Sequence, residues 1–80
     1  MQVNEIMSTD LATIAPEATL AAAALLMEQE DVGALPVADD GALVGFLTDR
    51  DITVRGVAQG MDPHSSVVGE VMTPFSCYLA

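Results

Sequence analysis

An apolar run in the first half of the chain limits what this protein can fold into. The run, ATLAAAALLM (residues 18–27), lies within a segment of good helix formers that predicts a helix over residues 17–31. One face of this helix would carry Leu20, Ala23, Ala24 and Met27. Alanine and leucine also cover most of the remaining surface, and a helix that is apolar nearly all round must be buried on more than one side. The chain therefore needs burial from a second layer and from a partner.

Shorter patterns on either side of this helix predict a small sheet. Strands are expected over residues 11–15 (LATIA), 34–38 (ALPVA) and 43–47 (LVGFL), with the turn signal DDG between the last two. Pro36 suits an edge strand or a strand start. A second helix is expected over residues 49–58, ending near Gly60. The order strand, helix, strand, strand, helix predicts an α/β (α+β) unit with two helices packed on a short mixed sheet.

The two ends of the chain resemble each other. VNEIMSTDLATIA (residues 3–15) aligns with VGEVMTPFSCYLA (residues 68–80) without a gap. Identical pairs are Val3/Val68, Glu5/Glu70, Met7/Met72 and Ala15/Ala80. This repeat predicts that residues 1–66 form a first motif and that residues 67–80 begin a second, truncated copy. A repeat unit that is begun and not completed leaves a face uncovered.

Size and charge exclude several classes of function. Eighty residues are marginal for a single core, so a homodimer or pairing with another motif is expected. A single cysteine forms no intramolecular disulfide and favours a reducing, cytoplasmic setting. His64 and Cys77 are the only soft ligands, so no metal or other required cofactor is expected. The net charge of −10 argues against nucleic acid and anionic membranes, and the apolar run is about half of the roughly 20 residues that span a bilayer.

The only two cations of the chain, Arg50 and Arg55, lie near the start of the second predicted helix. Thr48 and Asp51 there have the spacing of a capping box, in which each side chain bonds the backbone N–H of the other residue. The same carboxylate is also suited to accept from the vicinal hydroxyls of a ribose. A helix N-terminus beside Arg50 favours a phosphate. The residues alone leave both interpretations open: a structural cap, or a site for a nucleoside that carries phosphate.

The sequence GFLTDRD (residues 45–51), together with VGALPVAD upstream and VGEVMT downstream, resembles the cystathionine-β-synthase (CBS) domain family. The resemblance covers nearly the whole chain. It implies that two motifs pack as a pair and that adenosine-containing ligands bind in the clefts between them. It also implies a regulatory role for an attached or partner protein.

The resemblance also implies roles for individual residues. Asp51 would accept from the ribose hydroxyls, Thr48 would contact ribose or phosphate, and Arg50 would contact phosphate. The base and its ribose edge would be lined by Thr13 and Ile14, and the adenine ring by Ala34, Pro36 and Val37 through backbone groups and an apolar wall.

Two functions follow as hypotheses. The first is a sensing module for AMP, ADP, ATP or S-adenosylmethionine that signals to a partner protein of unknown identity. The second is a structural dimerisation module that binds no ligand. An enzyme is not expected, because His64 in a loop and Cys77 in a strand are the only histidine and cysteine from which a nucleophile and its base could be drawn.

Overall fold

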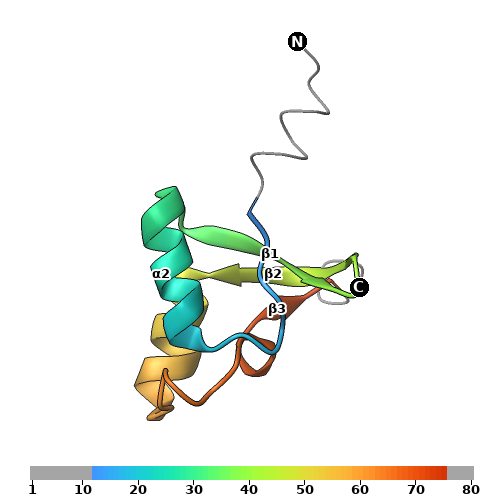
Figure 1. The fold of residues 1–80 in the computed structure, drawn as a ribbon. Helices are drawn as coiled ribbons and strands as arrows, with labels where there is room; N and C mark the ends of the chain where they lie inside the picture. The colour runs from blue at the N-terminus through green and yellow to red at the C-terminus, as the bar shows by residue number, and fades with distance from the viewer. Residues whose placement is uncertain (1–11, 76–80) are drawn as a thin grey trace.

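A computed structural model describes residues 12–75 of the chain. The helix α2 (Leu20–Glu30) and a helical segment over residues 49–59 lie side by side, and an antiparallel sheet with the strand order β1, β2, β3 packs against them (Figure 1). The strands are β1 (Ala34–Asp39), β2 (Ala42–Thr48) and β3 (Thr73–Pro74). The α+β class predicted from the sequence is confirmed.

The helix α2 begins three residues later than the sequence predicts. Its N-cap is Thr19, whose Oγ1 accepts a hydrogen bond from the Ala22 N–H at 3.1 Å. Threonine is a favoured N-cap residue because its side chain satisfies a backbone donor of the first turn. The residues between Pro16 and Thr19 form a turn that precedes the helix. At the other end, Asp31 takes a left-handed conformation and closes the helix.

The strands β1 and β2 form the predicted hairpin. Asp40 and Gly41, between them, both have positive φ angles, 54° and 83°. A two-residue loop of this kind matches the natural twist of paired strands, which explains the choice of glycine at the second position. Leu35 pairs with Leu47 across the hairpin, so two large apolar side chains enter the core at the same level.

The described part of the strand predicted over residues 11–15, residues 12–15, forms a single parallel bridge, between Ile14 and Val37. The Ile14 N–H donates to the Pro36 carbonyl at 3.0 Å, and the Ala38 N–H donates to the Ile14 carbonyl at 2.9 Å. Pro36 lies on this outer edge of the sheet, where its missing N–H removes no bond from the β1–β2 ladder. The three strands themselves are antiparallel, so within residues 12–75 the mixed sheet that the sequence predicts is reduced to this isolated parallel bridge.

The second helical segment changes type along its length. After Asp49 and Arg50 it continues as a π-helix, η1 (Asp51–Gly56), and then as a 3₁₀ turn, η2 (Val57–Gln59). Gly60, with φ of 81°, closes it, close to the end that the sequence predicts. Gly56 is buried, and a Cβ atom there would lie 2.9 Å from Leu20 Cδ1. The absence of a side chain therefore lets this segment approach α2 closely.

Residues 67–75, called here the closing segment, pack onto the preceding unit. The segment contains the 3₁₀ helix η3 (Val68–Glu70) and β3, which pairs with β2. Val68 and Val71 are 0% and 1% exposed and belong to the core. The core side chains are Leu20, Ala23, Met27, Leu35, Val37, Leu47, Val68 and Val71. The sequence also predicts a one-turn helix over residues 3–7 and a strand over residues 77–80, which both lie outside the described residues. The boundary between residues 66 and 67 remains a prediction.

None of the helices within residues 12–75 is long and apolar enough to cross a bilayer.

Candidate functional site

The junction between β2 and the following helix forms the capping box that the sequence predicts. The Thr48 N–H donates to Asp51 Oδ2 at 3.1 Å, and the Asp51 N–H donates to Thr48 Oγ1 at 3.0 Å. Both residues are half-buried. An ionised carboxylate has about four acceptor positions, so the cap leaves most of the acceptor capacity of Asp51 unused. Thr48 and Asp51 therefore form a complete helix cap, and Asp51 can still accept hydrogen bonds from a ligand.

A further residue reaches this carboxylate from the closing segment. Thr73 Oγ1 lies 3.4 Å from Asp51 Oδ2 and 3.5 Å from Asp51 Oδ1, and donates to both. No local pattern predicts this contact, because the two residues are 22 positions apart. The alignment of the chain ends pairs Ser8 with Thr73, so both copies of the repeat have a residue with a hydroxyl group at this position.

The two arginines have different surroundings. Arg55 Nη1 donates to the carbonyls of Val71 and Met72, at 3.2 Å and 3.3 Å. Its guanidinium thus holds the closing segment through backbone carbonyls and not through an acidic side chain. Arg50 is exposed in the first turn of the helix, one residue before Asp51. Of the two cations, Arg50 is the one available to a ligand at the junction.

The remaining predicted site residues lie in two places along the strands. Ala34 is paired with Thr48 and therefore adjoins the junction. Ile14 and Pro36 lie around the parallel bridge to Val37, three residues along β1 from Ala34, which corresponds to roughly 10 Å. Thr13 is exposed beside them.

Burial limits what Val37 can offer to a ligand. Its side chain is 0% exposed and packs in the core, so any contact from it would use backbone atoms.

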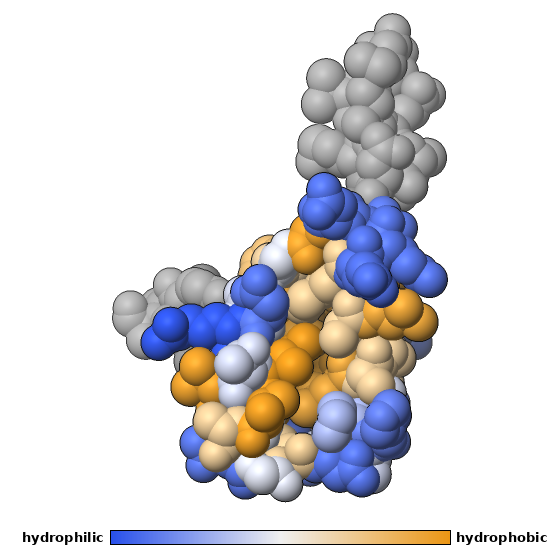
Figure 2. Space-filling view, turned by 90° about the vertical axis from the view of Figure 1, so that its left-hand side faces the viewer, coloured by the Kyte–Doolittle hydropathy of each residue, from blue (hydrophilic) through white to orange (hydrophobic). Residues whose placement is uncertain are grey.

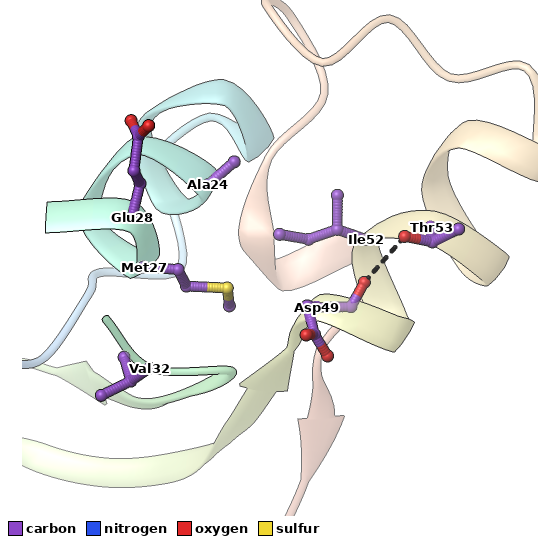
Figure 3. Close-up of a pocket in the computed structure, with 7 residues that line it drawn as sticks. All are labelled: Ala24, Met27, Glu28, Val32, Asp49, Ile52 and Thr53. Atoms are coloured by element: carbon purple, nitrogen blue, oxygen red, sulfur yellow. Dashed lines mark hydrogen bonds between the residues drawn. The ribbon is translucent and has the colours of Figure 1, made fainter. Parts of the chain in front are cut away.

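A separate hollow opens on the helix side of the molecule. Its volume is about 310 Å³, and it lies between α2 and the segment over residues 49–59. The lining residues are Ala24, Met27, Glu28, Val32, Asp49, Ile52 and Thr53, labelled in Figure 3. Met27 and Ile52 point toward one another across it, and Figure 2 shows apolar side chains gathered around this hollow. Sequence reasoning missed the hollow, and none of the predicted ligand-binding residues lines it.

The charge around the hollow is negative. Glu28 and Asp49 are its charged lining residues, and both are exposed. An apolar floor with carboxylates beside it suits an apolar side chain far better than a phosphate. Within residues 12–75, no group of three or more histidine, cysteine, aspartate or glutamate side chains is placed to hold a metal ion.

The sequence model of the CBS domain matches residues 3–56, which is more than half of the chain. The chain belongs to the CBS domain family. The CBS domain-containing protein YhcV of Bacillus subtilis is 49% identical over 71 residues, which is 89% of this chain and 50% of that protein. The chain therefore spans about half the length of this curated relative. The matched range includes the sequence GFLTDRD (residues 45–51), on which the resemblance rests.

Solved structures of CBS proteins have the same fold. A crystal structure of Hypoxic Response Protein I, with two coordinated zinc ions, superposes with a TM-score of 0.74 at 44% identity. That comparison covers 78% of this chain and 52% of the other. A hexameric CBS-CP12 protein from bloom-forming cyanobacteria gives a TM-score of 0.73 at 32% identity, covering 92% of this chain and 42% of the other.

Proposed function

We propose that this CBS domain is a regulatory module that binds an adenosine-containing nucleotide, such as AMP, ADP, ATP or S-adenosylmethionine, in a cleft completed by a second motif. The observation that carries the proposal is the half-buried Asp51 carboxylate, which keeps free acceptor positions after capping the helix. A ribose presents two neighbouring hydroxyl donors that match such a carboxylate.

The neighbours of Asp51 support the same ligand. The Thr48 hydroxyl accepts from the Asp51 N–H, and its own proton is still available to a ribose or phosphate oxygen. Arg50 is exposed on the same turn, where it would meet a phosphate. Ala34 adjoins Thr48 and would lie beside the base, with Thr13, Ile14, Pro36 and Val37 further along the sheet edge.

Pairing with a second motif is the second part of the proposal. In the described chain, α2 leaves apolar side chains uncovered, and Leu25 is 53% exposed. The hexameric assembly of the cyanobacterial CBS-CP12 protein is consistent with association between CBS motifs. We propose a homodimer, or a pair with another CBS motif, in which residues 1–66 are a first motif and residues 67–80 begin a second.

The module is proposed to be regulatory and not catalytic. It would act on a partner protein, in the cytoplasm, with nucleotide as a regulatory ligand and no required cofactor. A single cysteine and a net charge of −10 support this setting and disfavour nucleic acid and anionic membranes as partners.

Substitution of Asp51 by asparagine tests the ligand site. Asparagine keeps an oxygen that accepts from the Thr48 N–H but loses the charge and half of the acceptor capacity. We expect Asp51→Asn to lower the affinity for AMP about tenfold or more, because hydrogen bonds to a charged group contribute about 1.5–3 kcal/mol. The free energy of unfolding should fall by less than about 1 kcal/mol. Titration calorimetry with AMP and chemical denaturation measure the two quantities.

The structural alternative predicts a different pattern. The complete capping box and the uncovered α2 surface would also serve a dimerisation module that binds no ligand. In that case AMP, ATP and S-adenosylmethionine would give no heat at micromolar concentrations. Asp51→Asn would then alter stability alone, and association would persist in every variant.

A further inference from the structure

The Asp51 carboxylate is held by the protein from two directions. The backbone N–H of Thr48 donates to Oδ2 at 3.1 Å. The hydroxyl of Thr73 lies at nearly equal distances, 3.4 Å and 3.5 Å, from the two carboxylate oxygens and contacts both. These distances exceed the roughly 2.5–3.0 Å that is usual for O–H···O bonds. The Thr73 bond is therefore weak and readily exchanged for a better donor.

Thr73 lies in the last described part of the closing segment, in the outer strand β3. Within residues 12–75, β3 covers Thr73 and Pro74 and pairs with β2 through Gly45 and Phe46. The next residue, Phe75, donates its N–H to the Val44 carbonyl at 3.0 Å. The preceding part of the segment is anchored separately, by the buried Val71 and by Arg55. The side chain of Thr73 thus links Asp51 to β3, whose attachment to β2 is separate from the anchors of Val71.

A vicinal diol that binds a carboxylate with both hydroxyls needs both oxygens. Thr73 lies across these two oxygens, on the side from which a diol would reach both, so its hydroxyl and the diol compete for the same positions on the carboxylate. We infer that Thr73 competes with a ribose diol for Asp51, so that binding of a nucleotide loosens β3 on β2. The inference rests on the proposed function and adds to it a route from the ligand to the segment where the second motif begins. Linkage requires the reverse effect too: a firmly held β3 weakens nucleotide binding.

Affinity measurements on the 80-residue chain test the competition. Valine matches threonine in shape but donates no hydrogen bond, so Thr73→Val should bind AMP about threefold more tightly than the unaltered chain. Thr73→Ser keeps the hydroxyl and should bind with the unaltered affinity. Ser65→Ala is a matched control, because it removes an exposed hydroxyl in a loop away from Asp51. Should valine disturb β3, Thr73→Ala removes the same donor.

Amide hydrogen exchange tests the loosening of β3. Saturation with AMP should accelerate exchange of the Phe75 N–H in the unaltered chain and leave it unchanged in Thr73→Val. The Ala38 N–H, which donates to Ile14 at the opposite edge of the sheet, is the internal reference. The analogue 2′,3′-dideoxy-AMP has no diol and should not accelerate exchange at Phe75.

The outcomes separate this inference from the proposed function. Equal AMP affinity in the unaltered, valine and serine chains, with no change at Phe75, overturns the inference and leaves nucleotide binding intact. Weaker binding by Thr73→Val also overturns it, since Thr73 would then assist the ligand. If no chain binds AMP, both the inference and the proposed function are wrong.

Discussion

Thr48 is both the last residue of β2 and the cap of the helix that follows. Its Oγ1 accepts from the Asp51 N–H at 3.0 Å, so loss of this oxygen leaves a backbone donor of the first turn unsatisfied. We expect Thr48→Val to lower the free energy of unfolding by about 1 kcal/mol. Thr48→Ser keeps the oxygen and should retain most of the stability in the same denaturation experiment. Equal losses in both variants would mean that the methyl group, and not the cap, stabilises this junction.

The two arginines offer a second comparison of single residues. Arg55 donates to two carbonyls of the closing segment, whereas Arg50 is exposed in the first turn of the helix. We expect Arg55→Met to lower the free energy of unfolding by about 0.5–1 kcal/mol, a modest value because the side chain is largely exposed. Arg50→Met should leave stability within about 0.5 kcal/mol of the unaltered chain. The opposite ranking in denaturation curves would contradict the proposed role of Arg55.

Among the secondary-structure elements, those with local signals could be predicted from the sequence. The hairpin follows from DDG, whose last two residues take positive φ angles, and the second helix ends near Gly60 as expected. The start of α2 could not be placed as well, because Pro16 and Thr19 are competing start signals and only the cap geometry decides between them.

The closing segment could not be predicted in its present place, because its contacts are distant in the sequence. Val68 donates its N–H to the Ala18 carbonyl, and Thr73 donates to Asp51. Periodicity describes one element at a time and carries no information about such pairings. The capping box between Thr48 and Asp51 was predictable for the opposite reason, since a fixed spacing of three residues defines it.

The contact between β2 and β3 depends on Gly45. A Cβ atom at this position would collide with the Thr73 carbonyl and would come within 2.9 Å of Pro74 Cα. We expect Gly45→Ala to displace β3, to lower the free energy of unfolding by about 1–3 kcal/mol and to speed exchange of the Phe75 N–H. Gly69→Ala is the control, because its Cβ would meet no atom closer than 3.4 Å. Unchanged exchange at Phe75 in Gly45→Ala would show that β3 is not held by this close approach.

At the scale of the whole molecule, the chain has more apolar surface on α2 than its own core covers. Leu20, Ala23 and Met27 are buried, but Ala24 is exposed at the hollow and Leu25, the next residue of α2, is 53% exposed. The sequence predicts a helix that is apolar nearly all round, and in the structure one side of this helix accordingly carries exposed apolar residues. A second motif packed there would remove this surface from water, which is the main source of stability in such associations.

Association through α2 makes a prediction about mass in solution. The unaltered chain should form a dimer whose population rises with concentration, as measured by light scattering. Ala24→Glu should shift the mass toward the monomer, because a carboxylate buried in an apolar contact without a partner is strongly unfavourable. Ala42→Glu adds the same charge at an exposed position in β2 and should leave the mass unchanged. A monomeric mass for all three chains at every concentration would contradict pairing, and the proposed nucleotide cleft would then have only one wall.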